Sequence, residues 1–176
     1  MGKNNMNIDN EIKHAFSPIL REPAWMARLG HGSFLTFEFG APTLRRKDPT
    51  EHFKKRMMIV RGEWHLWIYC CLWEVRDGGA LVANSDSSRE QMSNAARILD
   101  GQILCSVGYL RDTMRCRFEF DLGGILETWL DRTDPSEQWM LYNGQNDVWT
   151  LNAENELKRT PYQISQPTAS MRLAPD

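Results

Sequence analysis

The chain has 176 residues, of which 41% are apolar, and its net charge is -2 with acidic and basic residues interspersed. This length fits one domain with a sizeable core, and the near-neutral charge argues against a general affinity for nucleic acid or membrane surfaces. No apolar segment reaches the length of a membrane span, and the first residues lack the apolar run of a signal peptide. We therefore expect a cytoplasmic protein.

The first part of the chain alternates short apolar stretches with glycine and proline. We expect a short helix over 9–16, ended by Pro18, and a strand over 34–39 with Leu35, Phe37 and Phe39 on one face. The polar and basic segment 43–56 contains Pro49. We interpret it as a surface loop or an extension with a solvated face rather than as a phosphate-binding patch.

The stretch 64–75 is the one around which we expect the core to be built. It reads Trp-His-Leu-Trp-Ile-Tyr-Cys-Cys-Leu-Trp-Glu-Val, so both of its alternating sets of positions are mostly apolar. That pattern is typical of a central strand buried on two sides. A buried helix is the alternative, but the aromatic density and the flanking glycines favour a strand.

The clearest predicted helix spans 87–100. Ser87 and Glu90 form a Ser-x-x-Glu capping box, apolar residues recur at helical spacing, and Gly101 is a natural stop. The remaining predicted strands share alternating or continuous apolar runs bounded by turn residues: 57–60, 81–83, 103–110, 114–121, 125–130, 138–142 and 147–151. The fold class is therefore α+β, mainly antiparallel sheet, with one globular domain over 1–158 and a loose tail over 159–176.

A short motif recurs in the two halves of the chain. Phe-Glu-Phe at 37–39 returns at 118–120, and each copy is followed later by Trp-x-Leu, at 64–66 and at 139–141. These matches suggest a pseudo-repeat of two β-units, 33–75 and 114–151, that pack around a shared core with the helix between them.

Residues 97–151 also resemble a known kind of domain. The resemblance is carried by Leu-Asp-Gly-Gln at 99–102, Val107, and the strand–turn–strand sequence Phe-Glu-Phe-Asp-Leu-Gly-Gly-Ile-Leu at 118–126. This pattern is similar to that of small bacterial β-rich domains of unknown function, some of which resemble immunity proteins encoded beside polymorphic toxins. The resemblance implies a non-enzymatic binder of a protein partner, and it supplies no catalytic residues.

Residues that could bind metals or act as nucleophiles show no recognisable spacing. The four histidines form no HxH, HxxxH or HExxH pattern and the four cysteines form no CxxC pair, so we expect neither a metal nor another cofactor. The cysteines are interpreted as buried thiols of a cytosolic protein. They are Cys70, Cys71, Cys105 and Cys116.

Two candidate chemical sites have simpler structural explanations. Glu38 and Glu119 would be an acid–base pair only if they shared one cavity, but alternation turns each away from its phenylalanine neighbours, toward solvent or the next layer. His31 lies in a glycine-flanked turn beside Ser33. A pocket around His31, Ser33 and Glu63 would indicate a small hydrolase-like or ligand-binding protein, which is the alternative to a binding module.

The predicted contact surface of a binding module is the late hairpin 137–151 with the loop 131–136. Its rigid aromatic and adaptable polar side chains are typical of interfaces, and its acidic residues would suit a basic partner such as a nucleic-acid-cleaving toxin. The alternative is that both tryptophans belong to the core. The candidate binding residues are Trp139, Tyr142, Asp147 and Trp149, with His31 as a further candidate.

Overall fold

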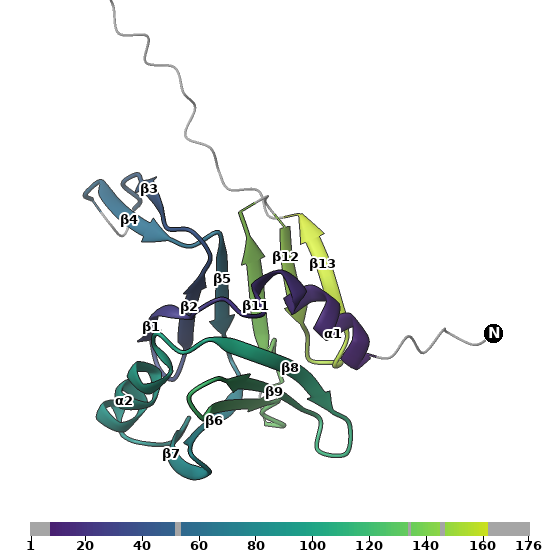
Figure 1. Ribbon diagram of the computed structural model, residues 1–176. Helices are drawn as coiled ribbons and strands as arrows, with labels where there is room; N and C mark the ends of the chain where they lie inside the picture. Colours follow the sequence, from purple (N-terminus) through teal and green to yellow (C-terminus); the bar gives the residue numbers. More distant parts are fainter. Residues whose placement is uncertain (1–7, 52–53, 134, 145–146, 162–176) are drawn as a thin grey trace, which may run out of the picture.

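A computed structural model describes residues 8–51, 54–133, 135–144 and 147–161. Its elements confirm the predicted α+β class with mainly antiparallel sheet (Figure 1). In chain order they are α1 (Ile8–Phe16), η1 (Ser17–Ile19), β1 (Trp25–Leu29), β2 (Leu35–Phe39), β3 (Thr43–Lys47), β4 (Met57–Arg61), β5 (Trp64–Ile68), β6 (Leu72–Asp77), β7 (Ala80–Asn84), α2 (Arg89–Leu99), β8 (Leu104–Leu110), β9 (Arg115–Phe120), β10 (Gly124–Trp129), β11 (Trp139–Asn143), β12 (Asp147–Leu151) and β13 (Leu157–Pro161).

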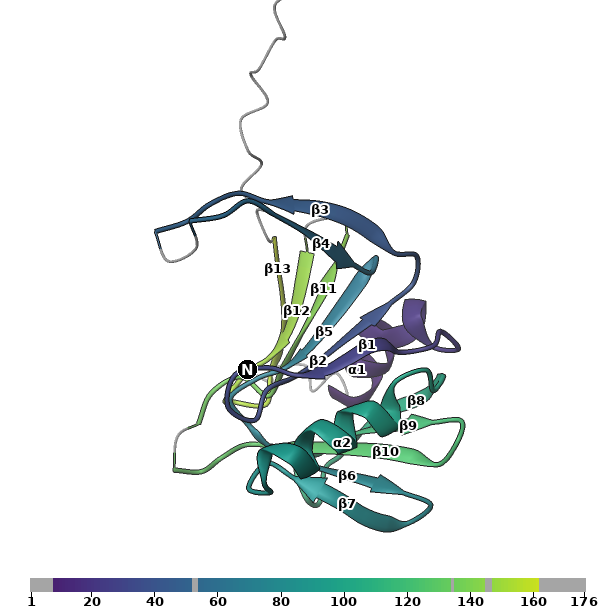
Figure 2. The ribbon, with the colours of Figure 1, turned by 90° about the vertical axis from the view of Figure 1, so that its left-hand side faces the viewer.

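The strands form two large sheets and one separate hairpin. The six-stranded sheet has the order β1-β2-β5-β11-β12-β13, and the five-stranded sheet has the order β7-β6-β10-β9-β8. Strands β3 and β4 pair only with each other and stand away from the core, across the opposite face of the six-stranded sheet (Figure 2). The six-stranded sheet therefore has one face toward the core and one face toward this hairpin.

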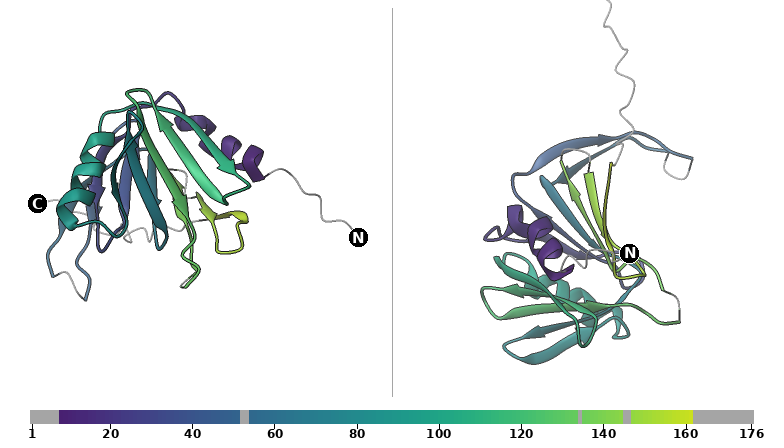
Figure 3. Two further views of the ribbon diagram at one scale, coloured as in Figure 1. Left: turned by 90° about the horizontal axis from the view of Figure 1, so that it is seen from below. Right: turned by 90° about the vertical axis from the view of Figure 1, so that its right-hand side faces the viewer.

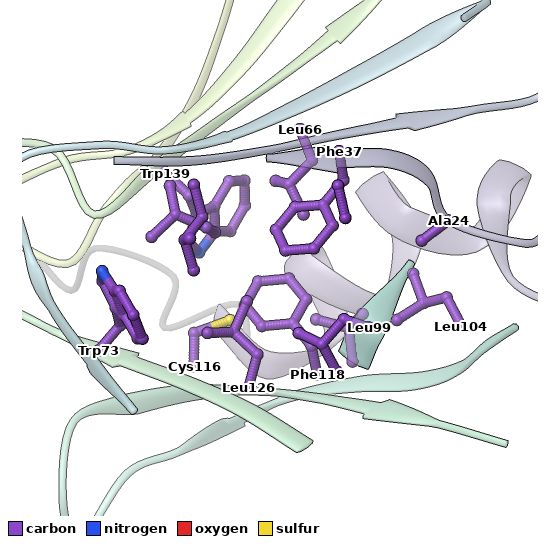
Figure 4. Close-up of a cluster of buried hydrophobic side chains, with 14 of the residues drawn as sticks. Ala24, Phe37, Leu66, Trp73, Leu99, Leu104, Cys116, Phe118, Leu126 and Trp139 are labelled. Carbon is purple, nitrogen blue, oxygen red and sulfur yellow. The ribbon is translucent and has the colours of Figure 1, made fainter. Parts of the chain in front are cut away.

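The core fills the space between the inner faces of the two large sheets (Figure 4). Phe37 and Trp139 come from the six-stranded sheet and Phe118 from the five-stranded sheet, and all three are fully buried. Phe16 of α1 joins the sheets, because its ring packs edge-on at 5.0 Å from Trp139 and 5.4 Å from Phe118, between ring centroids. Such aromatic contacts add to the free energy gained by burying apolar area.

Each helix closes one side of the sandwich (Figure 3). Helix α2 packs on β1, β6 and β7, while α1 packs on β8 and β13. Both helices are amphipathic and bury their apolar faces, which is the arrangement expected of short helices stabilised by tertiary contacts. Neither described helix is long and apolar enough to cross a membrane.

The prediction of a single strand over 64–75 is wrong. The chain forms β5, turns at 69–71, and continues as β6 in the other sheet. Even-numbered Leu66 and Ile68 face the core from the first sheet, whereas odd-numbered Trp73 and Val75 face it from the second. Both alternating sets are apolar because the inward-facing positions change phase where the chain crosses between sheets. Each piece is nevertheless an interior strand of its sheet.

Other boundaries also differ from the sequence analysis. Helix α2 begins at Arg89 with Ser88 as its N-cap, and the capping box joins Ser88 to Gln91 rather than Ser87 to Glu90. The side chain of Ser87 is used instead by the preceding turn, where its Oγ accepts a hydrogen bond from the Asn84 amide at 3.0 Å. The segment 43–47, expected to belong to a surface loop or an extension, is strand β3.

The end of the described chain extends the six-stranded sheet. Strand β13 pairs with β12 up to Pro161, three residues beyond the predicted end of the domain at 158. The rest of the predicted tail, 162–176, lies outside the described residues.

The two Phe-Glu-Phe motifs lie in β2 and β9, in different sheets, and their phenylalanines face the common core. The two Trp-x-Leu motifs lie in β5 and β11, which pair with each other. The pseudo-repeat of whole units remains a prediction.

Candidate functional site

The face of the six-stranded sheet that looks toward the β3–β4 hairpin carries a row of polar and aromatic side chains. Strand register places Glu38 of β2 opposite His65 of β5, and His65 opposite Tyr142 of β11. Side chains directly opposite each other in paired strands lie on the same face. The alternation that sends the phenylalanines of β2 into the core therefore sends Glu38 toward the hairpin.

Glu38 is buried there, with 2% of its surface exposed. Its carboxylate accepts a hydrogen bond from Arg61 Nη1 at 2.6 Å, another from the Gly62 amide at 2.9 Å, and a third from His65 Nδ1 at 2.9 Å. Glu38 faces away from its neighbouring phenylalanines, as the alternation predicts. The sequence does not reveal that Arg61 and Gly62, at the base of the hairpin, cover this carboxylate.

Burial by itself would raise the pKa of Glu38, since it disfavours the charged form. The hydrogen bonds from His65, Arg61 and Gly62, together with the positive charge of His65, outweigh burial and hold the pKa of Glu38 below its ordinary value. The carboxylate is thus the charged centre of the cluster. Nδ1 of His65 therefore carries the proton that is donated to Glu38. The other ring nitrogen, Nε2, has no hydrogen-bond partner among the described residues.

The close approach of the hairpin base to the sheet requires glycine at position 62. A Cβ atom built there would lie 2.9 Å from Phe39 N and 2.9 Å from Trp64 O, and closer still to Phe39 O. All of these are backbone atoms, which cannot rotate away as a side chain can. Gly62 therefore lets the chain leave β4 and enter β5 while its amide reaches Glu38.

A pocket of about 210 Å³ opens beside the cluster, between the hairpin base and the outer face of the six-stranded sheet. Arg45 reaches it from β3 and Arg61 from β4, while Trp67 and Tyr142 supply aromatic surface from the sheet. The rings of His65 and Tyr142 are 5.9 Å apart between centroids, tilted by 44°. The complete lining is Arg45, Arg61, Gly62, Glu63, His65, Trp67, Tyr142 and Asn143.

The opposite, outward face of the hairpin lies on the side away from this pocket. At one edge of it, Met58 and Val60 also border a hollow formed with β1 and β2. Register pairs Leu44 with Val60, and Arg46 with Met58, so these four side chains share one face. The three apolar side chains among them are 41 to 66% exposed. Large apolar side chains grouped on an exposed face are uncommon on monomers and are typical of interaction surfaces.

The predicted contact residues of the late hairpin are mostly used within the protein. Trp139, expected at the surface, is fully buried in the core, because it lies on the inner face of β11. Asp147 forms an ion pair with Arg159 of β13. Trp149 packs between Arg159, 5.3 Å from its ring centroid, and the ring of His14, 6.5 Å away. Of the four candidate residues of the hairpin, Tyr142 lines the pocket. Residues 134 and 145–146 of this predicted surface lie outside the described part of the chain.

The residues of the predicted hydrolase-like pocket are not brought together. His31 and Ser33 precede β2, whereas Glu63 lies beyond its other end, next to the start of β5. Ser33 is held by the core, because its carbonyl accepts a hydrogen bond from Trp73 Nε1 at 2.6 Å. The pocket that Glu63 lines does not include His31. Glu119 lies in the other sheet from Glu38 and is bonded to Ser106 and Arg117, so the two glutamates do not share a cavity.

The cysteines divide into two groups. Cys71 and Cys116 are buried, as expected, and burial raises the pKa of both thiols, that of Cys116 to about 12. Cys105, in contrast, is exposed and Cys70 is half-buried, so the prediction of buried thiols holds for two of the four. Within the described residues, no group of three or more His, Cys, Asp or Glu side chains is placed to hold a metal ion.

The site includes three residues that were not predicted from the sequence, Arg45, Arg61 and His65, and it includes Glu38, whose predicted role was structural. The only signal was local: a glutamate between two core phenylalanines in β2, and a histidine among aromatic residues in β5. Their proximity depends on the register of β2 with β5 and on the fold of the hairpin.

Comparisons with protein-family models, with curated proteins and with solved structures gave no match. The resemblance of residues 97–151 to immunity-type domains therefore remains a prediction.

Proposed function

We propose that the protein is a non-enzymatic binding module that docks onto an acidic protein partner through the outward face of the β3–β4 hairpin. The observation that carries this proposal is the group of exposed apolar side chains on that face, Leu44, Met58 and Val60, beside Arg46. Methionine and arginine are enriched at protein interfaces, and the buried centre of an interface is more apolar than its rim. The resemblance to immunity-type domains also favours a protein partner.

The charge of the hairpin indicates the chemistry of that partner. Residues 43–61 contain seven basic and two acidic residues, a net charge of +5, in a chain whose net charge is -2. The rest of the chain therefore carries a net charge of -7. A basic hairpin on an acidic body orients the molecule toward a negatively charged surface and speeds encounter with it. This replaces the basic partner that the acidic late hairpin suggested.

The outer face of the five-stranded sheet is a less suitable surface, because its charges neutralise one another. Arg115 lies 2.8 Å from Glu127 and 3.6 Å from Glu74, and Arg117 lies 3.0 Å from Glu127. The guanidinium of Arg115 also stacks on Trp129, 4.0 Å from the ring centroid. A partner would have to break these internal contacts before it gained new ones.

The apolar face also favours a protein over a nucleic acid, since nucleic-acid interfaces are dominated by polar and basic contacts to phosphates. The test uses a triple variant, Leu44→Ser, Met58→Ser and Val60→Ser. The matched control replaces three leucines of the other sheet and its turns, which are 39 to 72% exposed. That control is Leu81→Ser, Leu110→Ser and Leu122→Ser.

Each immobilised chain is exposed to extract from its source organism, treated with nuclease, and the retained protein is purified and titrated by calorimetry. The wild-type chain and the control should bind it equally, with an affinity that falls as salt rises. The hairpin variant should bind at least about tenfold more weakly, since a single interface anchor often contributes more than 1 kcal/mol. Equal binding by all three chains, or retention that disappears with nuclease treatment, would overturn the proposal.

A further inference from the structure

The pocket on the inward side of the hairpin has features that the docking face does not use. Arg45 lines it, and no hydrogen bond or ion pair joins Arg45 to any other described residue. The next residue of β3, Arg46, does have a partner, because it forms an ion pair with Asp48 at 3.1 Å. A half-buried guanidinium aimed into a pocket without a carboxylate partner is an available fork of hydrogen-bond donors.

Two further side chains are held in place around the same pocket. Arg61 donates a hydrogen bond from one amino group, Nη1, to Glu38, and His65 donates one from Nδ1 to the same carboxylate. Glu38 is itself buried and so fixes the position of both side chains without occupying the pocket. Holding donor side chains through a buried partner reduces the ordering cost when a ligand binds.

The acidic residue of the lining is turned toward the start of the hairpin. Glu63 accepts a hydrogen bond from the Ala41 amide at 3.3 Å, and its Oε2 lies on the side of Gly40, where a Cβ would approach it to 2.6 Å. Its carboxylate thus serves the start of the hairpin. The pocket retains the donors of Arg45 and Arg61 for an anionic group.

The remaining walls are aromatic. Trp67 and Tyr142 line the pocket from neighbouring strands, and their rings offer flat apolar surface to a planar group. The volume of about 210 Å³ is below the usual range for drug-sized ligands. It suits a small molecule or the terminal part of a larger one.

We propose that this pocket binds a small ligand with an oxyanionic head, phosphate or carboxylate, attached to a flat ring. Arg45 and Arg61 receive the oxyanion, the Nε2 side of His65 completes the polar wall, and the ring packs on Trp67 and Tyr142. This site is independent of the outward docking face, which lies on the opposite side of the hairpin.

The test titrates the full-length protein with four probes, followed by calorimetry and by the indole N–H resonance of Trp67 in NMR spectra. Adenosine monophosphate and benzoate carry the two kinds of head on a ring, and adenosine and benzamide are their uncharged counterparts. Arg45→Gln is the site variant and Arg46→Gln is the matched control. The control changes the next residue of the same strand, which points to the other face and already has a partner.

We expect one of the two anions to bind with a dissociation constant of millimolar or tighter and to shift the Trp67 resonance. The uncharged counterpart should bind at least about tenfold more weakly, because a hydrogen bond to a charged group contributes more than a neutral one. Arg45→Gln should weaken binding of the anion by about tenfold and Arg46→Gln by less than twofold. The better probe identifies phosphate or carboxylate as the preferred head.

Three results would overturn the proposal. The first is that neither anion binds at about 10 mM, which is tenfold above a millimolar dissociation constant. The second is that charged and uncharged probes bind equally. The third is that the two arginine variants lose the same affinity for the anion. Since none of these measurements involves a protein partner, they leave the proposed docking function unaffected.

Discussion

Replacing Gly62 by alanine is the sharpest test of how the hairpin is attached to the sheet. The new Cβ would lie 2.9 Å from two backbone atoms of the flanking strands and closer to a third, so the chain must shift. Overpacking of this kind costs about 1–3 kcal/mol. The shift would also weaken the hydrogen bond from the Gly62 amide to Glu38, and a hydrogen bond to a charged group is worth about 1.5–3 kcal/mol. We therefore expect Gly62→Ala to lower the free energy of unfolding by about 3–5 kcal/mol.

The assay is thermal unfolding followed by circular dichroism. For a chain of this length, 1 kcal/mol corresponds to about 2–4 °C in Tm, so the variant should melt about 10 °C below the wild type. Gly108→Ala is the matched control, because it also adds one methyl group to a strand glycine, and its Cβ would meet only Asp9 Oδ1 at 3.4 Å. If Gly62→Ala lowered Tm by less than about 3 °C, or no more than Gly108→Ala, the close approach at the hairpin base would be refuted.

Two further predictions concern ionisable groups. The pKa of Glu38 is lower in the folded protein than its ordinary value, so its contribution to stability is present above that value and is lost as pH falls through the folded pKa. In urea unfolding, the difference in stability between wild type and Glu38→Gln should therefore shrink from pH 6 to pH 3. A constant difference would contradict this. Cys105 is exposed, whereas burial raises the pKa of Cys71 and Cys116, so a maleimide at pH 8 should label Cys105 first and the two buried thiols only after unfolding. Mass spectrometry of Cys105→Ser should show that the fast labelling phase is lost. A fast phase that persists in this variant would contradict the exposure of Cys105.

The sequence determined the local structure wherever one segment carries its own signal. Alternation in 34–39 and 114–121 predicted strands with buried phenylalanines, and the structure has them as β2 and β9. The apolar stripe and glycine stop around 87–100 predicted α2, with the cap displaced by one residue. The prediction failed where adjacent serines offered two similar capping boxes, since only the packing of the turn at 84–87 decides which serine begins the helix.

Tertiary structure decided everything that depends on where strands meet. The stretch 64–75 is apolar on both alternating sets whether it forms one strand or two, because periodicity does not reveal that the chain changes sheets at 69–71. The basic segment 43–56 shows no apolar alternation from which a strand could be predicted. Its first residues form β3 because they pair with β4.

The candidate sites follow the same division. The sequence by itself shows seven basic residues in 43–61 and aromatic residues in the segments that form β5 and β11. That Glu38, Arg61 and His65 converge is decided by antiparallel pairing, which brings residues 23 to 27 positions apart within 3 Å of one another. The pairing of distant strands is a property of the whole core, because the free energy that fixes the register comes from burying the opposite faces of those strands.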